Sequence, residues 1–162
     1  MGIFKSNERY GHSHGWNEIA LNSKAITVHS LEHACIALKA AYELNVPVTL
    51  LSAPGAAGYA GVGWFRALID EAITEYPDVK MTPILDCSTA AGVALTAIRE
   101  GMPTICFSGR KTVKDKIMDI AFQAGVSVLT RRAQSLDLGD FELVVTDLSE
   151  ACRDWLKSSA SS

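Results

Sequence analysis

The chain has 162 residues, of which 48% are hydrophobic and 20% charged, and its formal net charge at pH 7 is −3. This length and composition are typical of one globular domain with its own core, and they exclude a disordered chain. A mildly acidic chain without an apolar run of about 18 residues favours neither a nucleic acid nor a membrane as its partner.

The first 24 residues carry scattered aromatic side chains and no apolar stretch typical of a signal peptide. We interpret residues 1–24 as an arm that docks on the body or on a neighbouring subunit, residues 25–157 as a single α/β domain, and residues 158–162 as a disordered tail. The four cysteines show no C-x-x-C spacing, so we expect reduced thiols in a cytoplasmic protein.

Five segments share one pattern, in which a small or rigid residue precedes four mostly apolar residues and a serine or threonine follows. They are residues 25–30, 47–52, 83–88, 103–108 and 125–130. Short, nearly continuous apolar runs of this kind are typical of strands that are buried on both faces of a parallel sheet. A sixth strand is predicted over residues 142–146.

Helical patterns alternate with these strands, over residues 31–44, 64–76, 89–99, 112–124 and 148–157, whereas residues 131–141 hold at most a helical turn. The alternation predicts a three-layer α/β fold, flavodoxin-like or Rossmann-like, with a mainly parallel sheet of five or six strands and helices on both faces. The helix over residues 31–44 is apolar nearly all round, so it is either deeply packed or lies at a subunit interface, and we also expect a homo-oligomer.

Ligands of open parallel sheets bind outside the carboxyl ends of the strands. We therefore expect the hydroxyl residues that follow the five strands to lie along one edge of the sheet and to mark the site. They are Ser30, Ser52, Ser88, Ser108 and Thr130. The alternative is that these hydroxyls serve as helix N-caps, which favour serine and threonine.

A glycine-rich loop, residues 52–63, follows the second strand and contains Gly55, Gly58, Gly61 and Gly63. Glycines before a helix allow backbone N–H groups to approach an anion, so this loop is a candidate phosphate or nucleotide cradle. Its spacing is neither G-x-G-x-x-G nor a Walker motif, and it could equally allow close packing of a helix or form a mobile flap.

A second strand-to-helix turn carries two cations. Ser108, Gly109, Arg110 and Lys111 are the residues of this turn, and its basic side chains could meet a phosphate or form a solvated basic surface.

Asp86 and Cys87 are the candidate catalytic residues at the end of the third strand. A carboxylate that closes a buried strand needs a partner, and Asp86 could hold a ligand or act as a general base. A thiol ahead of a helix could be a nucleophile, but Asp86 opposes thiolate formation, so Cys87 could instead be a small buried side chain.

Four histidines fall within the first 33 residues, and residues 29–33 spell H-x-x-E-H. The zinc-protease mechanism needs both histidines on one helix face, whereas His29 belongs to a strand end and His33 to a helix. The remaining metal hypothesis is a looser site that uses His12, His14 and His29.

The function predicted first is binding of a small anionic molecule, phosphorylated or nucleotide-like, at the carboxyl ends of the strands. The alternatives are a non-enzymatic oligomeric assembly or regulatory domain, and a barrel-like lyase that uses Asp86. Five βα units are too few to close an eight-stranded barrel. The sequence identifies no cofactor.

Overall fold

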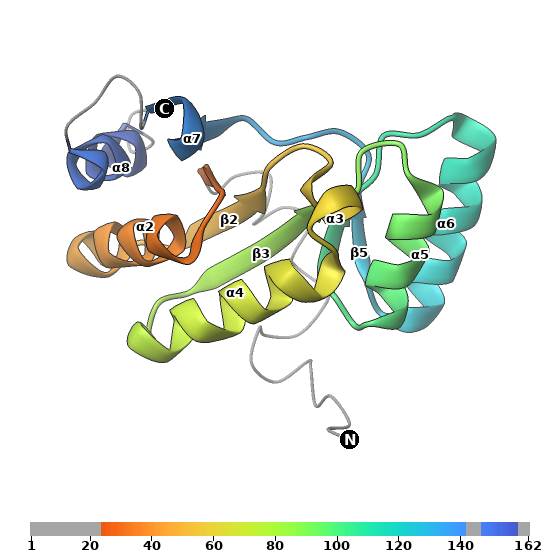
Figure 1. The fold of residues 1–162 in the computed structure, drawn as a ribbon, viewed down its shortest axis with the longest axis horizontal. Coiled ribbons are helices and arrows are strands. Elements are labelled where there is room, and N and C mark those ends of the chain that lie inside the picture. Colours follow the sequence, from red (N-terminus) through yellow and green to blue (C-terminus); the bar gives the residue numbers. More distant parts are fainter. Residues whose placement is uncertain (1–23, 142–146, 159–162) are drawn as a thin grey trace.

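The computed structural model of the chain describes residues 24–141 and 147–158. The elements alternate much as the sequence patterns predict (Figure 1). They are, in chain order, β1 (Ala25–Val28), α2 (Leu31–Leu44), β2 (Val48–Ser52), α3 (Ala56–Tyr59), α4 (Val62–Glu75), β3 (Met81–Asp86), α5 (Ala91–Arg99), β4 (Thr104–Cys106), α6 (Lys111–Ala124), β5 (Ser127–Leu129), β6 (Ser135–Asp137), α7 (Leu138–Phe141) and α8 (Leu148–Lys157).

The six strands form one sheet in the order β5-β4-β3-β2-β1-β6, and every neighbouring pair is parallel. The predicted α/β class with a parallel sheet is therefore confirmed. Because all strands run the same way, their carboxyl ends share one edge of the sheet. The prediction that the hydroxyl residues after the first five strands lie along this edge is confirmed as well.

The helices differ from the expected arrangement on both faces. Within the described residues α2 contacts α8 and α4, and α5 contacts α4 and α6, so the long helices follow one another in a single layer (Figure 1). Strands β1 to β5 succeed each other in sheet order without a reversal, and right-handed crossovers that always step in one direction place their helices on one face. This sequential order is also that of β/α barrels.

The two faces of the sheet are accordingly unequal. The helix-covered face contributes to one large core cluster, in which Phe65, Leu38 and Phe107 are fully buried. The opposite face carries a small separate cluster, and Ala133 from the segment between β5 and β6 packs against it. That segment therefore crosses the face that the described helices leave uncovered. Its crossing brings Arg132 toward the middle of the sheet.

The sixth strand of the described sheet lies in a segment for which the sequence pattern predicts no strand. Residues 135–137 form β6, which pairs with β1 along Ala25↔Ser135 to Thr27↔Asp137, and the predicted strand over residues 142–146 lies outside the described residues. The expectation of only a helical turn over residues 131–141 is thus wrong. A three-residue edge strand whose only apolar residue is Leu136 carries no readable period.

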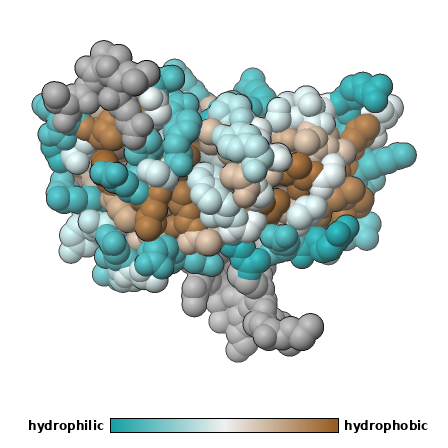
Figure 2. All heavy atoms as spheres, viewed as in Figure 1, coloured by the Kyte–Doolittle hydropathy of each residue, from teal (hydrophilic) through white to brown (hydrophobic). Residues whose placement is uncertain are grey.

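The helix-covered surface alternates polar stretches with apolar patches (Figure 2). The large apolar side chains that are exposed lie mainly on α2 and α6, and Phe122 on α6 is 86% exposed. None of the helices in the described part of the chain is long and apolar enough to cross a bilayer.

Candidate functional site

A buried ion pair joins the centre of the sheet's carboxyl edge to the crossing segment. Asp86, at the end of β3, is 4% exposed, and its Oδ2 lies 2.5 Å from Nη1 of Arg132. The same guanidinium donates to the backbone carbonyl of Ser52 at 2.9 Å and to the Thr27 hydroxyl at 2.8 Å. Arg132 thus bridges the ends of β1, β2 and β3. The predicted need of Asp86 for a partner is met by this residue.

Hydroxyl groups extend this network along the edge. Ser52 Oγ accepts the backbone N–H of Asp86 at 2.8 Å, and Oδ1 of Asp86 accepts the N–H of Ser88 at 2.7 Å. The Ser88 carbonyl in turn accepts the backbone N–H of Ser108 at 2.8 Å. Hydrogen bonds therefore connect the ends of β2, β3 and β4 into one polar strip, which we call the carboxyl-edge network.

Ser88 has a left-handed backbone with φ +52°, which non-glycine residues seldom adopt. Such a conformation costs of order 1 kcal/mol or more, and it persists where surrounding contacts fix it. The hydrogen bond from its N–H to Asp86 is one such contact. Strained residues of this kind gather at functional sites, so this observation supports the predicted location of the site.

N-capping explains only one of the tested hydroxyls. Ser30 Oγ accepts the N–H of His33 at the start of α2, whereas α3, α4, α5 and α6 begin without a side-chain cap. The capping interpretation is wrong for Ser52, Ser88 and Ser108, because other residues occupy the N-cap positions of the helices that follow them: Gly55 for α3, Ala90 for α5 and Arg110 for α6. Their polar groups connect neighbouring strand ends instead.

Cys87 has the surroundings of an inert thiol. Its side chain is 1% exposed, and burial, reinforced by the charges of Asp86 and Cys106, raises its pKa to about 12. A thiol with that pKa is almost wholly protonated at neutral pH and is a poor nucleophile. The structure therefore argues against a catalytic Cys87 and favours the alternative of a small core side chain.

The glycine-rich loop is more regular than the sequence predicts. Residues 56–59 form the short helix α3, and α4 begins at Val62. Gly55 and Gly61 precede these helices with φ of +69° and +89°, which explains glycine at both positions. Gly58 and Gly63 lie within the helices, and a Cβ at either would meet no atom within 4 Å. Gly55 and Gly61 therefore shape the turns that precede the two helices. Anion binding by this loop stays a prediction.

The turn between β4 and α6 is closely packed and positively charged. A Cβ on Gly109 would overlap the ring of Phe107, which is fully buried. The first turn of α6 has no side-chain cap, and Arg110 and Lys111 are exposed beside it. Lys111 forms an ion pair with Asp115 at 2.8 Å, whereas the side chain of Arg110 makes no hydrogen bond or ion pair with any other described residue. Among the described residues, the first backbone N–H groups of α6 therefore have no side-chain cap, and the Arg110 side chain beside them has no ionic partner.

Of the four histidines, His29 and His33 lie within the described residues. His29 Nε2 lies 2.6 Å from Oδ1 of Asp137, and His33 is buried. His12 and His14 lie outside the described residues, so the metal hypothesis that includes them stays a prediction. Within residues 24–141 and 147–158, no three His, Cys, Asp or Glu side chains are grouped so that they could hold a metal ion.

Three residues that the structure places here were not selected from the sequence. They are Thr27, Arg132 and Asp137, and they lie in or beside β1, the crossing segment and β6. The only available signal was the unpaired charge predicted for Asp86, which required a cation without indicating which one. Arg132 is 46 positions away from Asp86 in the sequence, and no local pattern links the two.

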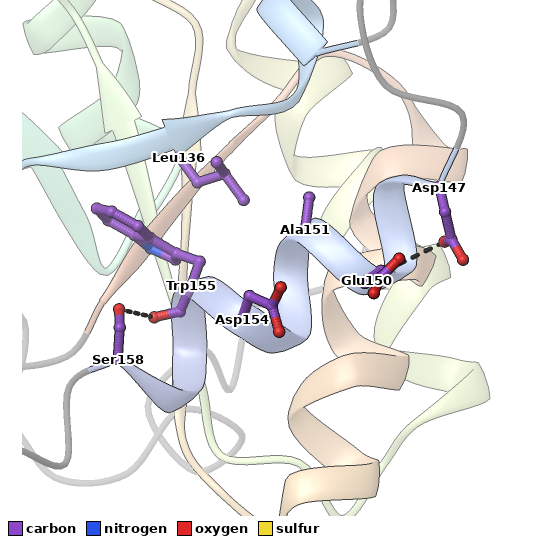
Figure 3. Close-up of a pocket in the computed structure, with 7 residues that line it drawn as sticks. All are labelled: Leu136, Asp147, Glu150, Ala151, Asp154, Trp155 and Ser158. Atoms are coloured by element: carbon purple, nitrogen blue, oxygen red, sulfur yellow. Dashed lines mark hydrogen bonds between the residues drawn. The ribbon is translucent and has the colours of Figure 1, made fainter.

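A separate cavity of about 480 Å³ opens between β6 and α8 (Figure 3). Its lining includes Leu136, Trp155 and three carboxylates, Asp147, Glu150 and Asp154. The cavity shares no residue with the carboxyl-edge network, and its carboxylates would repel an anion. It is therefore a poor site for the anionic ligand that the sequence predicts.

Comparison with known proteins finds sequence similarity to fructose-bisphosphate aldolases. The chain is 30% identical over 118 residues to a fructose-bisphosphate aldolase of Nostoc sp., and 29% identical over the same length to that of Xanthobacter flavus; each match covers 64% of this chain and 33% of the relative. The chain thus spans about a third of the length of these curated relatives. No protein-family model matches it.

The fold of this chain is also similar to that of a solved structure. A protein from Coccidioides immitis that is assigned as a fructose-1,6-bisphosphate aldolase superposes with a TM-score of 0.57 at 20% identity, over 68% of this chain and 41% of that one. The two chains share an α/β fold. The carboxyl-edge network lies where ligands bind in parallel α/β folds of both open and barrel form.

Proposed function

We propose that this protein binds a phosphorylated sugar at the carboxyl edge of its sheet. The observation that carries the proposal is the similarity over 118 residues to proteins named fructose-bisphosphate aldolases, whose name specifies a sugar that bears phosphates. The predicted class of ligand, a small phosphorylated anion, agrees with that name. The position of the site follows from the parallel sheet, whose ligands bind at the carboxyl ends of the strands.

The phosphate is assigned to the start of α6. Backbone N–H groups at an uncapped helix N-terminus attract an anion, and the helix dipole adds about half a positive charge. Arg110 has no ion-pair partner among the described residues and is free to form charge-assisted hydrogen bonds with phosphate oxygens. Gly109 keeps the backbone of this turn against Phe107, and it leaves no side chain between the turn and the ring.

The carboxyl-edge network supplies the polar groups for the sugar. The Ser108 side chain is exposed and lies 3.3 Å from the Ser88 carbonyl, so both residues present oxygen atoms next to the proposed phosphate position. Ser52 is fully buried and serves the network from within. In this proposal Asp86 and Arg132 hold the strand ends in place. A role of Asp86 as the general base of a lyase would require Asp86 to release Arg132 and the N–H of Ser88.

The proposal is tested by thermal unfolding with fructose 1,6-bisphosphate, with fructose and with inorganic phosphate. At a hundred times its dissociation constant, a ligand stabilises the folded state by about 2.7 kcal/mol. We expect fructose 1,6-bisphosphate to raise the melting temperature and fructose to leave it unchanged.

Arg110→Ala should abolish most of that stabilisation, whereas Lys116→Ala, which removes an exposed cation from the same helix, should not. Equal responses of the two variants would contradict the assignment of the phosphate to the start of α6. A protein that responds to none of these compounds would favour the alternative of a non-enzymatic assembly domain. Release of triose phosphates in the same mixtures would identify a lyase.

A further inference from the structure

An imidazole–carboxylate pair lies at the carboxyl edge beside the network. His29 follows β1 and Asp137 ends β6, and these two strands are neighbours with Thr27 paired to Asp137. The His29 side chain is 36% exposed and that of Asp137 is 28% exposed. The pair is therefore accessible to a ligand at this edge, yet it is shielded enough to keep a fixed geometry.

The carboxylate of Asp137 is held in one orientation. Its Oδ1 accepts the backbone N–H of Gly139 at 3.0 Å and lies 2.6 Å from His29 Nε2. A carboxylate oxygen only accepts hydrogen bonds, so Nε2 of the neutral imidazole must carry the proton in this contact. The other nitrogen, Nδ1, then presents a lone pair. Histidines that are oriented by a carboxylate in this way are typical proton acceptors in enzyme sites.

The local backbone is shaped around the ring. A Cβ on Gly139 would lie 2.7 Å from His29 Nε2, so a larger residue there would push the ring away from Asp137. On the other side, the backbone N–H of His29 donates to Nδ1 of His33 at 3.2 Å, and the two rings meet edge to face at 5.9 Å. Contacts from α2, β6 and α7 thus fix the position of His29.

We propose that His29 is the proton acceptor for the ligand bound at the carboxyl edge, and that Asp137 and Gly139 are its positioning residues. The inference rests on the proposed binding of a phosphorylated sugar. A hydroxyl proton of the sugar passes to Nδ1, while the electron pair of the broken O–H bond stays on the sugar oxygen. Asp137 stabilises the resulting imidazolium, and the same proton returns to the ligand from Nδ1.

The test is nitrogen NMR of the histidine rings in the full chain, with His29→Gln used to assign the His29 signals. In the neutral imidazole of the free protein we expect the proton on Nε2 and none on Nδ1. Fructose 1,6-bisphosphate should move the Nδ1 signal toward its protonated position, and fructose alone should not. Melting temperatures of the same samples report binding independently of the histidine.

Asp137→Asn should abolish the ligand-induced shift of Nδ1, whereas Asp140→Asn, an exposed change on the same short helix as Gly139, should preserve it. If Asp137→Asn does not fold, Gly139→Ala should likewise abolish the ligand-induced shift of Nδ1, because the added Cβ would push the His29 ring away from Asp137. Ligand binding without any movement of the Nδ1 signal, or a proton found on Nδ1 in the free protein, would overturn this inference and leave the proposed function standing. Failure of every phosphorylated compound to raise the melting temperature would overturn both.

Discussion

At the scale of single residues, the ion pair of Asp86 and Arg132 explains why a carboxylate can end a buried strand. An uncompensated charge in this position would be costly, and the guanidinium removes that cost through contacts with three strand ends. The pair lies at the centre of the carboxyl edge, so the strands that carry the proposed ligand groups depend on it for their spacing.

Asp86→Asn should therefore destabilise the protein by about 2–3 kcal/mol, because it leaves a partly buried guanidinium without its counter-charge. Urea unfolding measures the change in the free energy of unfolding. Asp140→Asn is the matched control and should stay within about 0.5 kcal/mol of the unmodified protein. A similar small effect for both variants would show that Arg132 finds another partner or solvent.

Replacement by alanine should change the free energy of unfolding in opposite directions at Gly109 and at Gly92. Gly109→Ala should cost about 1–3 kcal/mol, because the added methyl group meets the buried ring of Phe107. Gly92→Ala lies in α5 with no atom within 4 Å of the new Cβ, and it should stabilise the protein by about 0.5–1 kcal/mol. Thermal or urea unfolding of the two variants compares them directly, and the same sign for both would contradict the packing described for the β4–α6 turn.

The buried thiols give a prediction with a defined pH range. Burial is the main cause that raises the pKa of Cys87 and Cys152 to about 12 and that of Cys106 to about 11. Their thiols stay protonated in the folded protein where an unfolded chain would ionise, so their contribution to stability is complete below about pH 8.5 and is lost as pH rises toward 11–12. At pH 8, Ellman's reagent should label these three cysteines only after unfolding. Rapid labelling of the native protein at Cys87 would contradict the burial and restore it as a candidate nucleophile.

At the scale of elements, the long helices could be predicted from their period, and five of the strands from their short, nearly continuous apolar runs. The helices Leu31–Leu44 and Leu148–Lys157 begin and end at the predicted residues. β6 and the crossing segment could not be predicted, because their structure comes from distant partners rather than from local pattern. Arg132 could not be predicted as a site residue for the same reason, because its position is set by contacts with the ends of distant strands.

The start of α6 illustrates a conflict between stability and binding. Arg110→Asp would supply the missing N-cap and a charge that suits the helix dipole, so we expect the free energy of unfolding to rise by about 0.5–1.5 kcal/mol. The same change should abolish stabilisation by fructose 1,6-bisphosphate, because it replaces the proposed phosphate-binding cation with an anion. Urea unfolding with and without the ligand measures both effects. Retained ligand stabilisation in this variant would place the phosphate elsewhere.

At the scale of the whole molecule, the single helix layer and the sequential strand order distinguish this domain from the doubly wound folds that the sequence suggested. Local patterns reveal the alternation of strands and helices but not the order of the strands, which decides the faces on which the helices lie. The class of fold and the edge at which the site is proposed are independent of that order. The homo-oligomer stays a prediction, and light scattering over a range of protein concentrations would test it by measuring the molar mass.

The most direct test of the account is a calorimetric titration of the protein with fructose 1,6-bisphosphate, repeated on Arg110→Ala and Lys116→Ala. The account predicts saturable binding to the unmodified protein and to Lys116→Ala, and a loss of about tenfold or more in affinity for Arg110→Ala, in line with about 1.5–3 kcal/mol for a hydrogen bond to a charged group. Binding of equal strength to all three proteins would contradict the site at the start of α6, and absence of binding would contradict the proposed function.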